Sequence, residues 1–156
     1  MSEIYKTELS CRTIVVERGP PMSEPIQNVE RMFRAIELGD VGNIEEYIAQ
    51  DYLNRESVDD GRTNKRGHEE FRDTVIWLRA SFSDLHFENA DVIACGDRVV
   101  VLTYMTGRHT ADFLGLPATG RTFRQRQVHL FRIDRFHKVC EHLAQRDDLR
   151  LRRQLS

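Results

Sequence analysis

Residues 122–146 read Thr-Phe-Arg-Gln-Arg-Gln-Val-His-Leu-Phe-Arg-Ile-Asp-Arg-Phe-His-Lys-Val-Cys-Glu-His-Leu-Ala-Gln-Arg. This stretch predicts two strands, Thr122–Ile133 and Val139–Arg146, joined by a tight reversal around residues 135–136. A Gly-Pro-rich turn at residues 115–121 precedes the pair, and a polar tail follows it. The rest of the chain has to fold around this hairpin.

Side chains along a strand point alternately to its two faces. One face of the first strand therefore carries neutral hydrogen-bonding groups beside an aromatic ring: Gln125, Gln127, His129 and Phe131. The other face carries Arg124, Arg126, Val128 and Leu130.

The reversal decides what faces these residues. An even number of loop residues would pair His129 with His142, Gln127 with Ala144 and Gln125 with Arg146. Histidine, glutamine and arginine side chains would then meet on one surface. An odd loop would turn the second strand over and separate them.

Length and composition limit the class of protein. The chain has 156 residues, 40% apolar residues, 31% charged residues and a net charge of −2. These values fit one globular domain, and the charge gives no reason to expect nucleic acid as a partner.

The termini and cysteines indicate a cytoplasmic protein. Charged residues stand where a signal peptide needs an apolar run, and no stretch has 18 consecutive apolar residues, so we expect neither secretion nor membrane insertion. Cys11, Cys95 and Cys140 lack Cys-x-x-Cys spacing and are expected as reduced thiols. Residues 1–21 end in Gly-Pro-Pro and are interpreted as an appendage, either disordered or contacting another subunit, before a domain at residues 22–156.

Helical spacing dominates the first half of this domain. A helix is predicted from Pro25 to Gly39, and a second helix is predicted to begin at a cap on Asn43. A polar loop then leads to a third helix after Gly67. The apolar positions that carry these predictions are Ile26, Val29, Met32, Phe33 and Ile36, then Ile44, Tyr47 and Ile48, and then Phe71, Val75, Leu78 and Phe82.

The period changes to two from Leu85 onward. Strands are predicted at residues 85–94 and 98–106, ahead of the hairpin. Three helices followed by about four antiparallel strands predict an α+β domain whose helices cover one face of a curved sheet.

Several short blocks resemble the SnoaL-like polyketide cyclases of the nuclear transport factor 2-like superfamily. The blocks are residues 51–54, 78–85, 106–110, 115–121 and 147–155, and the likeness spans roughly residues 25–155. The resemblance implies a cone-shaped α+β barrel with an apolar internal pocket, usually assembled as a homodimer or homotetramer. It also implies cofactor-free intramolecular aldol ring closure, in which an Asp acts as acid and base beside a His and an Asn.

The resemblance carries over only in part. Asn54 matches the family's Asn at the end of the second helix, and His129 matches the His of the long strand. The family's Glu-His-Trp-Asp is here Glu141-His142-Leu143-Ala144. Ala144 therefore occupies the place of the acid.

A histidine can supply the missing base. We expect His129 to be neutral at pH 7, because burial and the nearby His142 and Arg146 all disfavour its cation. The expected catalytic residues are His129, His142 and Asn54. Gln127 is expected to hold the oxyanion, and Arg146 to anchor an anionic or phenolic group. The alternative is that both histidines are satisfied residues of a polar core seam.

Three further candidates have two interpretations each. Trp77, Tyr104 and His109 are candidates for substrate binding, but core packing also fits Trp77 and Tyr104, and a structural hydrogen bond fits His109. Asp147 and Asp148 could replace the acid, although the expected register sets Asp147 against Arg124 in an ion pair. The arginines at residues 121–126 and 146–153 are interpreted as solvated or subunit-contacting faces.

The sequence thus predicts a cofactor-free and metal-free enzyme of the cyclase, isomerase or lyase type, acting on a hydrophobic polyketide-like molecule from natural product biosynthesis. One alternative is a cofactor-free hydroxylase or epoxide-opening enzyme on the same fold. Another is a non-catalytic ligand-binding or assembly module, which Ala144 favours.

Overall fold

The computed structural model describes residues 23–156, so the predicted appendage lies outside the described residues. In this part of the chain, one sheet has the strand order β1-β5-β4-β3-β2. The strands are β1 (Ile48–Asn54), β2 (Phe82–Cys95), β3 (Arg98–His109), β4 (Thr122–Ile133) and β5 (Val139–Arg146). The helices are α1 (Glu24–Leu38), the 3₁₀ turn η1 (Ile44–Glu46), α2 (Arg55–Asp59), α3 (Gly67–Ser81) and α4 (Asp148–Leu155).

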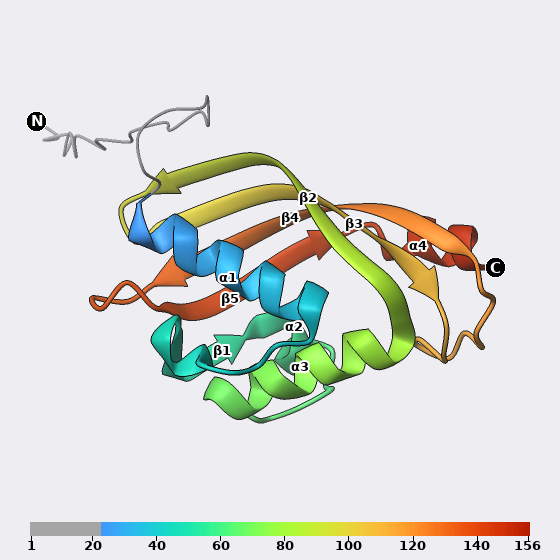
Figure 1. Ribbon diagram of the computed structural model, residues 1–156, viewed down its shortest axis with the longest axis horizontal. Coiled ribbons are helices and arrows are strands. Elements are labelled where there is room, and N and C mark those ends of the chain that lie inside the picture. The colour runs from blue at the N-terminus through green and yellow to red at the C-terminus, as the bar shows by residue number, and fades with distance from the viewer. Residues whose placement is uncertain (1–22) are drawn as a thin grey trace, which may run out of the picture.

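The sheet is strongly curved, and α1 and α3 lie on its hollow side (Figure 1). The buried stripe of α1 includes Ile26, Val29, Met32 and Phe33, as the sequence predicted. Gly39 ends this helix with φ at 72°, a conformation that glycine adopts without strain. The expected α+β architecture is confirmed. The expected barrel closure is not, because β1 and β2 are the two edges of an open, curled sheet.

The predicted second helix is wrong. Asn43 has φ at 54° and caps nothing with its side chain, and the helical turn that follows has only three residues. Ile48 already pairs with Val139, in a parallel arrangement of β1 with β5. One 3₁₀ turn suffices to bury Ile44 and Tyr47, so the apolar spacing that indicated a helix is satisfied without one. Residues 48–54 form the strand β1, which pairs with the edge of β5 that β4 leaves free.

A glycine fixes the start of α3 against β1. Gly67 has φ at 68°, and a Cβ added to it would lie 2.1 Å from the carbonyl oxygen of Gln50. No other residue fits so close to that backbone. The N-terminal turn of α3 therefore packs directly on the strand that ends at Asn54.

The register between β4 and β5 differs from the prediction. The loop at residues 134–138 is odd, since Ile133 pairs with Val139. The register then shifts by one, so that Arg132 pairs with Glu141 and Cys140 is passed over. This bulge restores the facing of β5. The observed pairs are Gln127 with Arg146, His129 with Ala144 and Phe131 with His142.

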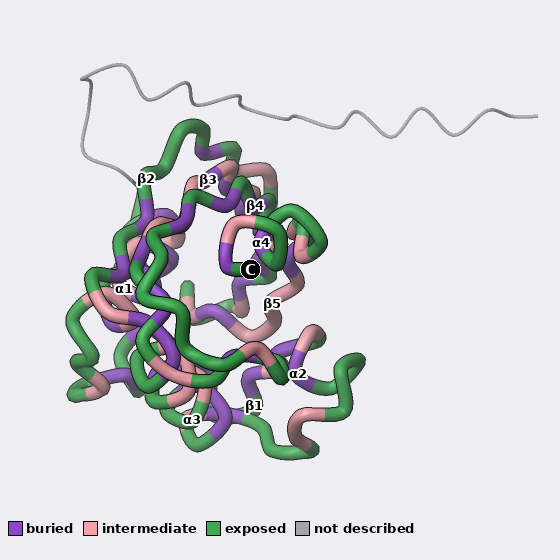
Figure 2. The backbone as a smooth tube through the Cα atoms, turned by 90° about the vertical axis from the view of Figure 1, so that its right-hand side faces the viewer, coloured by how far each residue is buried: buried purple, intermediate pink, exposed green. Residues whose placement is uncertain are grey.

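The predicted polar tail is a helix. The Asp147 side chain caps α4 by accepting a hydrogen bond of 2.9 Å from the backbone N–H of Arg150. Leu151 and Leu155, four residues apart, are buried against the sheet. Figure 2 shows α4 at the end of the curled sheet, beside β4 and β5. No helix within residues 23–156 is long and apolar enough to cross a membrane.

Candidate active site

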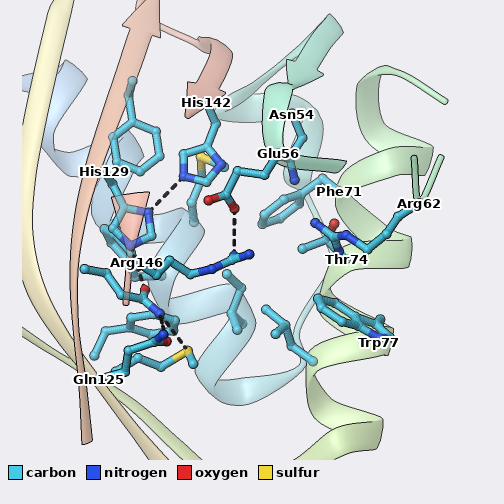
Figure 3. A pocket seen from close by; sticks show the side chains of 18 of the residues that line it. Asn54, Glu56, Arg62, Phe71, Thr74, Trp77, Gln125, His129, His142 and Arg146 are labelled. Carbon is cyan, nitrogen blue, oxygen red and sulfur yellow. Dashed lines mark hydrogen bonds and ion pairs between the residues drawn. The ribbon is translucent and has the colours of Figure 1, made fainter. Parts of the chain in front are cut away.

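A pocket opens between the hollow side of the sheet and the helices α1 and α3. It holds about 700 Å³ of empty space, its mouth included. Much of its wall is aromatic, with Phe33, Phe71, Trp77, Phe87, Phe113 and Phe131. Polar side chains from β4, β5 and the segment after β1 gather at one end (Figure 3). Such a pocket suits a largely apolar molecule with a few polar groups.

Two histidines meet at this polar end. Nδ1 of His129 lies 2.8 Å from Nε2 of His142, and the two ring planes are 18° apart with centroids separated by 5.1 Å. Nε2 of His129 lies 2.8 Å from Oε1 of Gln127. Both ring nitrogens of His129 therefore have protein partners. Nδ1 of His142 has none among residues 23–156, and the half-buried His142 ring lines the pocket.

Both histidines are held in the neutral form. Burial, then His142 and then Arg146 lower the pKa of His129 well below its usual value. Burial, with Arg146 and Arg62, lowers the pKa of His142 to about 3. The rings are also enclosed by aromatic groups, since Phe131 stacks on His142 at 4.9 Å. The predicted neutrality of His129 has a clear physical cause.

A line of hydrogen bonds continues from His129 to α4. Nε2 of Gln127 donates to Oε1 of Gln125 over 2.8 Å. Nε2 of Gln125 in turn donates to Oδ1 of Asp148 over 3.1 Å and to the backbone oxygen of Asp147 over 3.2 Å. Figure 3 shows Gln125 below His129 on the same face of β4. The alternating side chains of β4 therefore form one connected polar row.

The guanidinium of Arg146 is surrounded by carboxylates. It contacts Glu56 at 3.0 Å, Asp148 at 3.1 Å and Asp60 at 3.8 Å. Burial raises the pKa of Glu56, against the opposing effect of Arg146. Because its charge is already balanced, Arg146 is poorly placed to anchor an anionic group as the sequence analysis expected.

Asn54 and Arg62 line the pocket, and each has one buried side-chain atom that forms no hydrogen bond within the described residues. Nδ2 of Asn54 donates to the buried Glu70 over 3.0 Å, while Oδ1 of Asn54 is buried and has no hydrogen bond within the described residues. Nε of Arg62 is also buried without a hydrogen bond in that part of the chain, and its guanidinium lies over Trp77. Nε of Arg62 lies 3.7 Å from Oδ2 of Asp60. Asn54 and Arg62 both line the pocket, although Oδ1 of Asn54 and Nε of Arg62 are themselves closed to solvent.

The structure removes two predicted residues from the site. Tyr104 points to the opposite face of β3 from the pocket-lining Met105, and Arg124 covers its ring at 3.4 Å from the centroid. His109 is fully buried away from the pocket, with Nδ1 at 3.2 Å from Oγ1 of Thr119. Trp77, in contrast, lines the pocket and stacks on Phe113 at 5.0 Å.

The expected ion pair between Asp147 and Arg124 is wrong. Asp147 caps α4, and Arg124 instead pairs with Glu88 at 3.0 Å. Ala144 is buried on the inward face of β5, between His142 and Arg146.

Sequence reasoning missed Glu56 and Arg62 as site residues. Glu56 lies in the short helix α2 and Arg62 lies in the loop after it, and this polar segment gave no periodic signal. Within residues 23–156, no three His, Cys, Asp or Glu side chains are grouped so as to hold a metal ion.

Known proteins share both the sequence pattern and the fold. A family model described as SnoaL-like polyketide cyclase matches residues 27–155. Aklanonic acid methyl ester cyclase DnrD of Streptomyces peucetius is 36% identical over 113 residues, which are 72% of this chain and 77% of that protein. Nogalonic acid methyl ester cyclase of Streptomyces nogalater is 35% identical over 103 residues, 65% of this chain and 75% of that protein. The structure of TsrD from Streptomyces laurentii has a TM-score of 0.76 at 24% identity, covering 88% of this chain and 98% of that one.

Proposed function

Because the chain belongs to the SnoaL-like polyketide cyclase family, which confirms the resemblance drawn from its sequence, we propose that it closes a ring in a polyketide-like molecule by cofactor-free proton transfer. The observation that carries this proposal is the pair of neutral, hydrogen-bonded histidines at the polar end of an aromatic pocket. The pair occupies the region where the family's acid is replaced by Ala144.

In an aldol ring closure, a base removes a proton from a carbon between carbonyl groups. The resulting enolate carbon attacks another carbonyl of the same molecule, forming the C–C bond, and the new alkoxide takes up a proton. The proton lost from carbon and the proton gained by oxygen balance. One group can therefore serve as both base and acid.

His142 is the ring that meets the substrate. His129 is 7% exposed and bonded at both nitrogens, whereas His142 has a nitrogen without a partner in the described residues. His142 takes the proton from carbon and returns it to the alkoxide, while His129 supports the transient imidazolium through their hydrogen bond. The negative charge of the enolate, formed beside the ring, stabilises the positive charge of the His142 imidazolium. The pocket without substrate has no such charge beside the ring. His129, the base expected from sequence, therefore contacts His142 and not the substrate.

Arg62 and Asn54 are suited to the oxygens of the substrate. Both residues line the pocket, and we propose that the Arg62 guanidinium turns from Asp60 to donate to the enolate oxygen, while Oδ1 of Asn54 turns to accept from a hydroxyl group. Trp77 and Phe113 give the carbon skeleton a flat apolar wall.

The charges near the pocket favour an uncharged substrate. Glu56, Asp60 and Asp148 surround Arg146, so a carboxylate ligand would meet a surplus of negative charge. The relatives are named for methyl esters, in which a carboxylate is masked. We therefore assign a polyketide ester, rather than a free acid, to this pocket.

The experiment is to incubate the purified protein with aklanonic acid methyl ester, nogalonic acid methyl ester and the two free acids. Ring closure without loss of water gives a product of unchanged mass but altered retention and absorption. We expect conversion of at least one ester and slower or no conversion of the acids. Binding of both esters without conversion of either would refute the cyclase.

Such binding without turnover would instead support a non-catalytic ligand-binding module, the candidate that Ala144 favours. A product heavier by one oxygen would indicate the hydroxylase alternative. Mass spectrometry of the same incubation separates these outcomes.

Assembly and location are also proposed. Val128 and Ile93 are 42% and 41% exposed on the sheet, which supports a homodimer or homotetramer formed through strands β2 to β5. Light scattering coupled to size exclusion tests the mass of the particle. Residues 1–21 are proposed as an appendage to the domain at residues 22–156, and the widely spaced cysteines support a cytoplasmic location.

A further inference from the structure

We infer that Asp148, acting through Gln125, Gln127 and His129, fixes the tautomer of His142 so that its pocket-facing nitrogen is a base and not a hydrogen-bond donor. This inference rests on the proposed function, because it states which atom of that site receives the proton. It makes Asp148 and Gln125 positioning residues.

The direction of the hydrogen bonds is set at α4. Oδ1 of Asp148 and the backbone oxygen of Asp147 are acceptors only, and both lie within hydrogen-bond distance of the Gln125 amide. The NH₂ group of Gln125 must therefore point toward α4. Its oxygen then points along β4 toward Gln127, where it accepts the hydrogen bond of 2.8 Å from Nε2 of Gln127.

The donor and acceptor atoms of Gln127, His129 and His142 follow in turn. With its NH₂ group used on Gln125, Gln127 offers its oxygen to Nε2 of His129, which must carry a hydrogen. A neutral imidazole has one N–H, so Nδ1 of His129 is a lone pair. It accepts from Nε2 of His142 over 2.8 Å. The remaining nitrogen of the neutral His142 ring, Nδ1, is then a lone pair as well.

The reverse direction is disfavoured at its far end. Turning every group around would set the Gln125 oxygen against the carboxylate of Asp148 and the carbonyl of Asp147. Nε of Arg146 donates to the same Oδ1 of Asp148 over 3.1 Å, which keeps that oxygen in place as an acceptor. The reversed row would also present an N–H of His142 to the pocket, which cannot remove a proton from carbon.

In this arrangement the Asp148 carboxylate has a positioning role, whereas the resemblance implies that the family's acid exchanges protons with the substrate itself. The Asp148 carboxylate does not touch the substrate. Its acceptor oxygen sets the direction of the hydrogen bonds of Gln125, Gln127 and His129, and through them the tautomer of His142. The relay also satisfies the side chains of Gln125 and Gln127, which are buried with exposures of 1% and 3%.

The wild-type protein provides the first test. In ¹⁵N-labelled protein at pH 7, long-range ¹H–¹⁵N correlation distinguishes protonated from unprotonated ring nitrogens. We expect both His129 and His142 to be protonated at Nε2 and unprotonated at Nδ1. A His142 ring protonated at Nδ1, or an even mixture of tautomers, would overturn the inference.

Two matched variants test the relay. Gln125→Leu removes the link at similar size, and we expect mixed tautomers in both rings, with kcat lowered about ten- to hundredfold and KM within about threefold. Gln145→Leu makes the same change at an exposed glutamine of β5 that pairs with Val128 outside the pocket, so we expect the wild-type tautomers and the wild-type kcat. Unchanged tautomers in Gln125→Leu would overturn the relay. Expected tautomers without any turnover would refute the proposed function and leave the relay standing.

Discussion

Nδ1 of His129 lies 2.8 Å from Nε2 of His142, although the cross-strand partner of His129 is Ala144. The two rings meet diagonally, because the His142 side chain leans along β5 toward Ala144, whose small side chain leaves room for it. The methyl group of Ala144 thus lies beside the imidazole pair. The electrostatics of that pair lead to predictions that can be measured.

An acid at position 144 should raise the pKa values of the two histidines. In Ala144→Asp, the new carboxylate would lie beside both rings and stabilise their cations, raising the pKa of His142 by about 1–3 units from its value of about 3. An NMR titration of the ring Cε1–H resonances measures the shift. An unchanged titration of both rings would contradict this geometry.

The wild-type pH–rate profile should lack the usual histidine step. Burial, Arg146 and Arg62 lower the pKa of His142 to about 3, so the neutral base persists as the pH falls from 7. We therefore expect no fall in kcat/KM with a midpoint near pH 6.5, which is where protonation of an ordinary histidine base would lower it. Glu56, whose pKa burial raises, also lies beside Arg146. Repeating the profile with Glu56→Gln separates its contribution, and a midpoint near 6.5 in both proteins would contradict the lowered pKa of His142.

Stability should fall in mild acid. The pKa values of His129 and His142 are lower in the folded protein than in the unfolded chain, so below pH 6.5 the unfolded chain binds protons that the folded protein does not. Folding stability is therefore complete above this pH and decreases by up to about 1.4 kcal/mol per pH unit for each ring. Glu56 and Glu70, with raised pKa values, act in the opposite sense.

Urea denaturation between pH 7 and 5 measures this dependence. His142→Gln should remove one of the two histidine contributions and give a shallower loss of stability than the wild type. Equal slopes in the two proteins would show that His142 titrates normally in the folded state.

The α+β fold class was predicted correctly from the sequence, and the facing of the residues along β4 was predicted as well. Alternation along β4 placed Gln125, Gln127 and His129 on one face, and this arrangement needs only local geometry. The contact between His129 and His142 also came out correctly, but through a wrong register. The odd loop and the bulge at Cys140 cancel in their effect on facing, and neither leaves a clear signal in the residues.

Long-range contacts explain the failures. Residues 48–54 became a strand because the edge of β5 was free to pair with them, which no local pattern reveals. The tail became α4 because Leu151 and Leu155 found apolar surface on the sheet. Tyr104 and His109 were candidates by chemistry alone, and the direction of each side chain places it outside the pocket.

Gly67→Ala tests the junction that positions Asn54. The added Cβ would lie 2.1 Å from the carbonyl oxygen of Gln50, at a φ of 68° that alanine disfavours. We expect a loss of roughly 3 kcal/mol or more in the free energy of unfolding. Gly61→Ala is the control, since it has a similar φ of 66° and no atom within 4 Å of the added Cβ. Equal losses would show that the contact with β1 contributes nothing.

The most direct test of the central claim, that His142 moves the proton, is deuterium exchange at the reacting carbon. A polyketide methyl ester that the wild type converts is incubated in D₂O with wild type, His142→Gln and His86→Gln, and deuterium incorporation is followed by mass spectrometry. His86 is an exposed histidine whose side chain is 66% accessible and contacts Glu37, outside the pocket. We expect His142→Gln to lower the exchange rate about 10²- to 10⁴-fold while ligand affinity is kept, with His86→Gln at the wild-type rate. Exchange at the wild-type rate in His142→Gln would contradict the account.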